Sequence, residues 1–492
     1  MNKLLIPIVL APLALFAGDR GSSNNNGDAN AEVGAGASTK NATAAFIVPQ
    51  GFHGDAATGP ADVVGWWKKF NDPELQTLIE RALQTGLDMK IAKARVAEAR
   101  AVVAKAKAAP RPSVNENSNV FHSTGSPTNN HLSPTADQIL GINPSSGGGT
   151  VDSRSTGLQA KWTRNLFGGD KNNILAAKKD FEAAEEDEKV TMVSLAADVA
   201  TNYLQLRGYQ EQIDWTQRTS DLQEDTLKLA RARFSAGLIP DTDLPSMEAA
   251  LTATQATIPQ LQSGIEVAAH RLAVLTGQEP GALLNELLST KPLPEGPPAI
   301  PAGLPSDVLR RRPDVREAEH KIEAAKARKA VATAQRYPSF SLFGSFGDHA
   351  QSLSSLSLLN VGKFFNISPS MSLPLFQGGR IKSEIQNQSA RQEEAELLYQ
   401  KAVLQALQEV EDALVSHQRE TDRQRFLEQT VLNDQRKLDK AKELYTGGLQ
   451  DYSPVQDAEE ALLAAKTLLA ESRRNLAVDT VSLYRALGGG WD

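Results

Sequence analysis

The side chains that most often carry chemistry in proteins show no arrangement here that is typical of catalysis or metal binding. The chain of 492 residues has seven histidines and no cysteine. Without cysteine it forms no disulfide, thiolate nucleophile or cysteine-ligated zinc site. The histidines do not follow a metal-binding spacing such as HExxH, and no GxSxG, Walker-type or dinucleotide-binding motif occurs. We therefore predict no catalytic residue, no metal site and no cofactor.

The charges are equally uninformative about a substrate. The formal net charge is −7 and the isoelectric point is about 5.7, which argues against a nucleic-acid partner. Arg310, Arg311 and Arg312 form a short basic run, but Pro313 and Asp314 follow directly. Proline is tolerated in the first turn of a helix, so we interpret this run as a helix start with solvated arginines.

Carboxylates gather near two glycine-containing turns. Asp451 and Asp457 follow Gly447 and Gly448, and Asp241 and Asp243 follow Gly237 in a similar segment. Glycine permits the backbone conformations that a sharp turn between helices requires. Aspartates at these places could cap the next helix or could be ordinary solvent-facing residues.

Very long helices must position these turns. The segments from Asp170 to about Arg233 and from Arg380 to about Leu444 contain no proline and carry apolar residues at three- and four-residue spacing. Each corresponds to roughly 95 Å of helix. A second helix is expected to run back after each turn, so that two long helical hairpins result.

Shorter elements precede each hairpin. We predict helices from Pro73 to Ala109 and from Pro313 to Arg336, with Asp72 and Ser306 or Asp307 as capping residues. Alternation of apolar and polar residues predicts strands at 113–121, 155–167, 339–347 and 365–376.

The order of these elements repeats once along the chain. "DMKIAKARVAEARAVVAKAKAAPRPS" resembles "DVREAEHKIEAAKARKAVATAQRYPS", and the two turn segments resemble each other as well. We divide the chain into five parts: a signal-peptide-like segment 1–18, a Gly/Ala/Ser/Asn-rich linker 19–65, repeat 1 at 66–290, a Pro-rich link 291–305, and repeat 2 at 306–492.

The strands indicate contact with a membrane. Six of the fifteen phenylalanines lie between Phe340 and Phe376, as in the aromatic girdles of β-barrels. An open four-stranded sheet cannot lie in lipid because its edges leave backbone groups unpaired, so several chains would share one barrel. Two chains give eight strands and a filled interior, whereas three chains give twelve strands and room for a lumen. The alternative is a small soluble sheet that caps a coiled coil.

At this point the residues resemble a known family. "WWKKFNDPELQTLIERAL", "LPSDVLRRRPDVREAEHKI", "PLFQGGR", "YTGGLQDYSPVQDAEEAL" and "SLYRALGGGW" are similar to the TolC-like outer-membrane factors, specifically the efflux lipoprotein branch. The resemblance implies a mainly α-helical fold with a small membrane β part: a homotrimer with a twelve-stranded β-barrel continuous with a twelve-helix periplasmic α-barrel. Its implied role is a passive exit duct in the bacterial outer membrane that accepts small solutes from an inner-membrane pump through a periplasmic adaptor protein.

The resemblance also suggests site residues. It places Asp457 in an aspartate ring that constricts the periplasmic aperture, with Asp451 as a weaker candidate. Ser453 stands where relatives carry a leucine that forms an apolar constriction, which puts that part of the gate in doubt. The adaptor-docking tips would include the following residues: Arg233, Gly237, Leu238, Tyr445, Gly447, Gly448 and Leu449.

Lipoprotein relatives carry a lipidated cysteine after the apolar N-terminal run, where this chain has Asp19. No lipid can therefore be attached; either the cysteine was altered or this member relies on its barrel to hold it in outer-membrane lipid. Two other functions stay open from the sequence: a periplasmic coiled-coil adaptor or scaffold that never inserts in lipid, and a type I secretion channel.

Overall fold

The computed structural model describes residues 51, 63–124, 150–236, 243–297, 303, 305–350 and 362–491. It is mainly helical, with one four-stranded sheet. The elements in chain order are η1 (Trp66–Phe70), α1 (Pro73–Thr85), α2 (Leu87–Ala108), β1 (Ser113–Thr124), β2 (Thr150–Arg164), α4 (Gly169–Ser235), α5 (Asp243–Leu275), α6 (Leu284–Leu287), α7 (Pro305–Arg311), α8 (Pro313–Ala334), β3 (Ser339–Ala350), β4 (Gly362–Ser372), α9 (Arg380–Thr446) and α10 (Ser453–Ala486).

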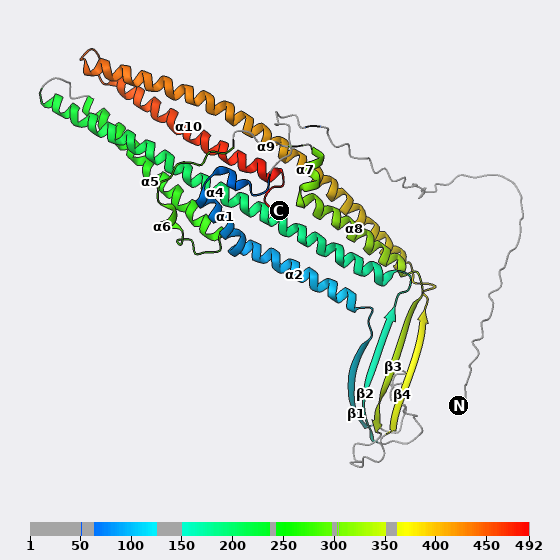
Figure 1. The fold of residues 1–492 in the computed structure, drawn as a ribbon. Coiled ribbons are helices and arrows are strands. Elements are labelled where there is room, and N and C mark those ends of the chain that lie inside the picture. Colours follow the sequence, from blue (N-terminus) through cyan, green and yellow to red (C-terminus); the bar gives the residue numbers. More distant parts are fainter. Residues whose placement is uncertain are drawn as a thin grey trace, which may run out of the picture. The chain divides into compact units, whose positions relative to one another are not determined.

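Two helices of equal length carry the structure. Helices α4 and α9 have 67 residues each, which corresponds to about 100 Å. Near the sheet, α8 packs against both of them and α2 packs against α4; toward the other end, α5 runs back along α4 and α10 runs back along α9 (Figure 1). Buried alanines such as Ala196, Ala197 and Ala200 leave no bulky side chain between neighbouring helices. The predicted long helices and hairpins are therefore present.

The four strands form a single antiparallel sheet in the order β1-β2-β3-β4. The central pairing, β2 with β3, joins the two halves of the chain, with Leu158 opposite Phe346 and Trp162 opposite Leu342. Within the described residues, strands β1 and β4 each pair on one side only. The sheet joins the helices at one of its ends, where β1 and β3 begin and β2 and β4 end (Figure 1).

One predicted helix is in fact two. The expected helix from Pro73 to Ala109 is interrupted at Gly86, which has extended backbone angles between α1 and α2. A Cβ atom at Gly86 would lie 2.4 Å from the carbonyl oxygen of Ala82 and 2.9 Å from that of Leu275. The chain thus bends where α1 meets the end of α5, and only glycine fits there. The cap by Asp72 is confirmed, because its side chain accepts from the backbone N–H groups of Glu74 and Leu75.

The basic run at residues 310–312 is also different from the prediction. Arg312 is 6% exposed and donates to the carbonyl oxygen of Ala486 and to the carboxylates of Asp314 and Glu409. The solvated-arginine interpretation is therefore wrong for Arg312, whose charge is neutralised inside the fold. Ser306 and Asp307 lie in the separate helix α7 and do not cap α8, which has no side-chain cap.

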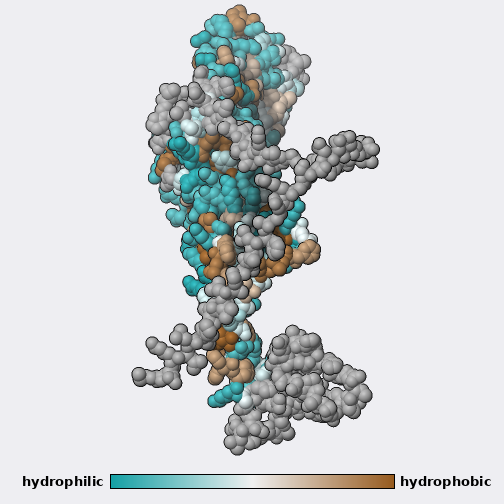
Figure 2. Space-filling model, turned by 90° about the vertical axis from the view of Figure 1, so that its right-hand side faces the viewer, coloured by the Kyte–Doolittle hydropathy of each residue, from teal (hydrophilic) through white to brown (hydrophobic). Residues whose placement is uncertain are grey.

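The main core lies where α1, α4, α5, α10 and the C-terminal residues meet. Trp66 stacks on Tyr484 with ring centroids 5.5 Å apart, and both side chains are buried. On the face that Figure 2 shows, the coloured helical surface is mostly hydrophilic, with hydrophobic side chains in separate patches. Among the described residues, no helix is both long and apolar enough to traverse a bilayer.

Candidate functional site

The sheet has two chemically different faces, because successive side chains on a strand point to opposite sides. One face, called the apolar face here, carries Val114, Leu158, Trp162, Phe340, Leu342, Phe346, Phe365, Ile367 and Met371. The same face also carries charged residues: Glu116 on edge strand β1, Arg164 at the helix end of the sheet, and Arg154, Asp348 and Lys363 toward its other end. Most of these apolar side chains are exposed in the single chain, although water disfavours them.

The opposite, polar face carries Asn115, Asn117, Gln159, Ser341, Ser345, Asn366, Ser368 and Ser370. Ser341 and Ser370 are joined by a hydrogen bond of 2.7 Å between their hydroxyl oxygens. Phe343 and Phe364 depart from this pattern, and Phe364 lies over Gly157 and Gly347, which leave room for its ring. Alternation of an apolar and a polar face is the pattern of a strand with lipid on one side and water on the other.

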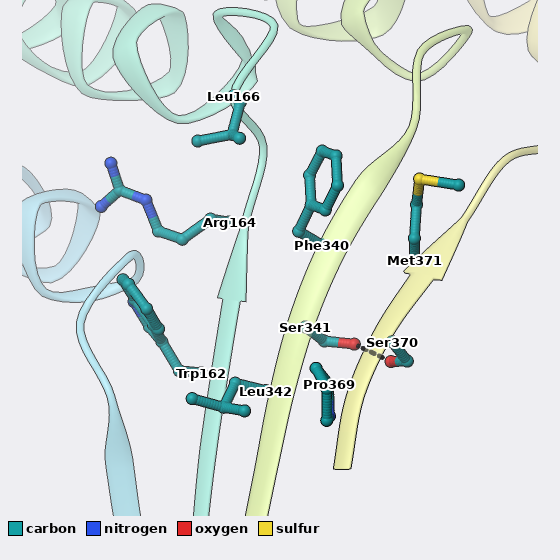
Figure 3. Close-up of a pocket in the computed structure, with 9 residues that line it drawn as sticks. All are labelled: Trp162, Arg164, Leu166, Phe340, Ser341, Leu342, Pro369, Ser370 and Met371. Atoms are coloured by element: carbon teal, nitrogen blue, oxygen red, sulfur yellow. Dashed lines mark hydrogen bonds between the residues drawn. The ribbon is translucent and has the colours of Figure 1, made fainter. Parts of the chain in front are cut away.

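A groove of about 520 Å³ lies on the apolar face next to the helices. Its lining comes from β2, β3 and β4 and from Leu166 just beyond β2. Figure 3 shows Trp162, Leu342 and Pro369 in one row across the strands, and Arg164 at the helix side of that row. The Trp162 indole Nε1–H donates to the carbonyl oxygen of Pro110 over 2.9 Å, which fixes the ring at the groove edge.

At the far end of the helices, the two hairpins are joined by a second hydrophobic cluster from α4, α5, α9 and α10, including Leu227, Met247, Leu438 and Val455. Arg233 at the end of α4 lies over the ring of Tyr445 at the end of α9, 5.1 Å from its centroid. Tyr445 is only 6% exposed, so both residues join the hairpins to each other within the chain.

The remaining predicted tip residues fall into two groups. Gly447 ends α9, Gly448 has a positive φ of 69°, and Leu449 is 78% exposed. Gly237 and Leu238, by contrast, lie outside the described residues. The turn between α9 and α10 thus presents the apolar side chain of Leu449 to solvent, which is one requirement of a docking surface.

The candidate gate residues are all on the surface of the turn or of α10. Asp451, Ser453 and Asp457 are exposed, and neither aspartate forms a hydrogen bond or ion pair with any residue in the described ranges. Asp457 points away from the buried side of α10, which carries Val455 and Ala458. These carboxylates are therefore available to another chain or to an ion, and residue 453 between them is an exposed serine.

Sequence reasoning missed a buried polar network between α1, α4 and the segment after α6. Arg207 is 0% exposed and donates to Glu74 over 2.6 Å, to Gln210 over 2.6 Å and to the Ser289 carbonyl oxygen over 2.8 Å. The pKa of Tyr203 is raised well above its ordinary value. Burial of the side chain is the main cause, and the hydrogen bond from its hydroxyl to Asp72 adds to it. Periodicity gives no signal for such a site, because its members come from three separate segments.

A second missed cluster brings Glu182 of α4 together with His320 and Glu323 of α8, with donor atoms within 4.8 Å of one another. Three such ligands could hold a metal ion. However, Lys179 Nζ lies 2.8 Å from Glu182 and 2.5 Å from Glu323. These hydrogen bonds raise the pKa of Lys179, and the one to Glu323 lowers the pKa of that carboxyl. The lysine ammonium occupies the position of a cation and ties α4 to α8.

Asp479 on α10 should make the stability of the helical part depend on pH. Burial, and then the charge of Glu420, raise the pKa of Asp479 to about 6 from an ordinary value of 3.8. Because the folded pKa is the higher one, the folded state favours the protonated carboxyl. The resulting stabilisation is complete below the ordinary pKa and is lost as the pH rises through about 6.

We therefore expect Asp479→Asn, which mimics the protonated acid, to raise the unfolding temperature at about pH 8 but not at about pH 4. The gain should be on the order of 1 kcal/mol, since the carboxyl is partly exposed. Thermal unfolding followed by circular dichroism measures it. Glu420→Gln should reduce the same pH dependence, and an unchanged pH profile in Asp479→Asn would contradict the assignment.

The chain was compared with known proteins. The family model described as outer membrane efflux protein matches residues 78–278 and 304–489. The pyoverdine export outer membrane protein OpmQ of Pseudomonas aeruginosa is 30% identical over 439 residues, covering 88% of each chain. The cation efflux system protein CusC of Escherichia coli is 29% identical over 433 residues, covering 87% of this chain and 88% of CusC.

Solved structures agree with this similarity. The outer-membrane channel OprN superimposes with a TM-score of 0.77 at 30% identity, and the match covers 90% of this chain and 99% of OprN. Family model, relatives and fold thus coincide over nearly the whole described part. The chain belongs to the outer membrane efflux protein family, whose members are channels rather than enzymes, and it is an outer-membrane channel of efflux systems.

Proposed function

We propose that three copies of this chain form a twelve-stranded β-barrel in the outer membrane, continuous with a twelve-helix α-barrel in the periplasm. The observation that carries this proposal is the sheet with one apolar and one polar face, whose edges at β1 and β4 pair with no other described strand. Edge strands in lipid need partners, so β4 of one chain would pair with β1 of the next until the barrel closes. The polar face then lines the lumen and the apolar face contacts lipid.

The helices support the same assembly. Helices α4 and α9 begin shortly after β2 and β4, so they extend the lumen from the membrane for about 100 Å toward the periplasm. The duct itself would be passive: it has no chemistry of its own, and it accepts small solutes from an inner-membrane pump through a periplasmic adaptor. The adaptor would contact the hairpin ends, where Leu449 and the glycines 447 and 448 are placed.

Oligomer mass and conductance test this function together. Native mass spectrometry of the purified full chain should give the mass of three chains, and insertion into a planar bilayer should give discrete conductance steps. A monomer or dimer that never conducts would contradict the channel assembly. A stable trimer without conductance would indicate a closed aperture. The Asp457→Ala variant distinguishes a closed aperture from the absence of a channel.

Asp457→Ala should raise the resting conductance several-fold. Three Asp457 carboxylates around one axis would narrow the aperture and select for cations, and alanine removes both the bulk and the charge. Single-channel recording measures the change. Asp457→Glu keeps the charge and should stay close to the parent chain, whereas equal conductance of the alanine variant and the parent would remove Asp457 from the gate.

A further inference from the structure

An arginine stands at each of the four places where the sheet meets the helices. Arg111 lies between α2 and β1, Arg164 ends β2, Arg336 lies between α8 and β3, and Arg380 begins α9. All four junctions are at the same end of the sheet (Figure 1). These four residues are called the arginine collar here.

Three of the four collar arginines carry positive charge without a carboxylate partner among the described residues, whereas Arg164 is paired with Asp170. The guanidinium groups of Arg111, Arg336 and Arg380 form no hydrogen bond or ion pair with any residue that the structure describes. The Nε atom of Arg164 lies 3.5 Å from the carboxylate of Asp170, and its Nη1–H donates to the Pro110 carbonyl oxygen over 3.3 Å. Its Nη2 has no partner among the described residues. The connecting segments 109–112, 165–168, 335–338 and 373–379 contain no acidic residue.

An apolar surface adjoins the collar on the side of the sheet. The groove beside Arg164 is lined by Trp162, Phe340, Leu342 and Met371, and its volume of about 520 Å³ is in the range of small-molecule sites (Figure 3). Leu375 and Phe376, in the segment between β4 and α9, are each 89% exposed. Exposed aromatic and aliphatic side chains next to unpaired guanidiniums are the composition of a membrane–water boundary.

We propose that the collar and the groove bind an anionic phospholipid of the inner leaflet of the outer membrane. Its acyl chain would lie in the groove against Trp162, and its phosphate would accept hydrogen bonds from Arg164 and the neighbouring collar arginines. A lipid whose headgroup carries an ammonium fits less well, because the connecting segments contain no carboxylate and the nearby Asp170 is already paired with Arg164 and with the backbone N–H of Asn165. This inference rests on the proposed barrel, which places the helix end of the sheet at the periplasmic boundary of the membrane.

Lipid retention measures the headgroup preference. The full chain is purified from mixed micelles of phosphatidylglycerol and phosphatidylethanolamine, and the retained lipids are counted by native mass spectrometry. We expect at least a tenfold preference for phosphatidylglycerol, and its loss in the double variant Arg336→Gln/Arg380→Gln. The matched control Arg419→Gln/Arg436→Gln makes the same charge change farther along α9, away from the sheet, and should keep the preference. Equal retention of both lipids by the parent chain would overturn the proposal.

Trp162 reports on the groove directly. Phosphatidylglycerol brominated on its acyl chain should quench part of the tryptophan fluorescence, and Trp162→Phe should lose that part while Trp215→Phe keeps it. Glycerol phosphate, which has the phosphate but no acyl chain, should neither quench nor displace the lipid. Quenching that is the same in Trp162→Phe and in the parent, or full displacement by glycerol phosphate, would contradict a lipid site.

Failure of this inference can be told from failure of the channel. The same preparations are tested for conductance in a planar bilayer. A parent chain that conducts but retains both lipids equally contradicts the lipid site and leaves the channel in place. A chain that retains phosphatidylglycerol at the collar but never forms a trimer contradicts the barrel instead.

Discussion

Replacing Ile367 by arginine should prevent most of the protein from reaching its assembled form in the outer membrane. Ile367 lies in the middle of β4 on the apolar face, with its side chain exposed in the single chain. In the proposed barrel it contacts lipid, where an arginine near the bilayer midplane costs about 2–4 kcal/mol in each chain. Because three chains form one barrel, this free-energy cost arises three times in each assembly. Trimer recovered from the outer-membrane fraction measures the effect.

The neighbouring position supplies the matched control. Asn366 lies beside Ile367 on the polar face, opposite Ser345. Asn366→Arg adds the same side chain to the side proposed to face the lumen, so trimer should assemble close to the parent level and the change should appear as altered ion selectivity. If both variants assembled equally well, the sheet would not have lipid on the apolar face.

Arg207→Ala should be the most damaging change in the helical part. It removes the partner of Glu74, whose side chain is 9% exposed, and leaves Gln210 and the Ser289 carbonyl oxygen with fewer hydrogen bonds. Breaking a buried ion pair by removing one partner costs about 3–5 kcal/mol. Lys291 also contacts Glu74 at 2.6 Å, so we expect a loss of about 3 kcal/mol, near the lower end. Urea unfolding followed by circular dichroism measures it.

The surface ion pair between Arg81 of α1 and Glu286 of α6 serves as the comparison with the buried pair of Arg207 and Glu74. Arg81 and Glu286 are 3.1 Å apart, but their side chains are 28% and 38% exposed. Arg81→Ala should therefore cost no more than about 1 kcal/mol. Replacing both buried partners, as in Glu74→Gln/Arg207→Met, should recover part of the loss because no buried charge is left unpaired. Similar losses for Arg207→Ala and Arg81→Ala would show that the network contributes little.

Most elements could be predicted because their signals are local. Proline-free segments with apolar stripes predicted α4 and α9 to within about two residues at each end, and alternation predicted four strands whose ends moved by a few residues. Asp72 was recognisable as a cap because capping uses residues next to each other in the chain. Family motifs identified the channel, and the comparisons confirmed that identification.

The errors occurred where a distant segment decided the outcome. Gly86 breaks a helix because the end of α5 lies against it, and Arg312 is buried because Glu409 and the end of α10 surround its guanidinium. In each case the neighbouring residues in the sequence are also compatible with the outcome that was predicted.

The sequence by itself determined the elements of this protein, their repeated order and its membership in a channel family, because periodicity, caps and motifs depend on residues close together in the chain. Only the tertiary structure decided how those elements meet. It set the register that separates the apolar from the polar face, the ion pairs at Arg207 and Arg312, and the arginine collar. These features join segments far apart in the chain, and such contacts form only when the helices and strands have packed.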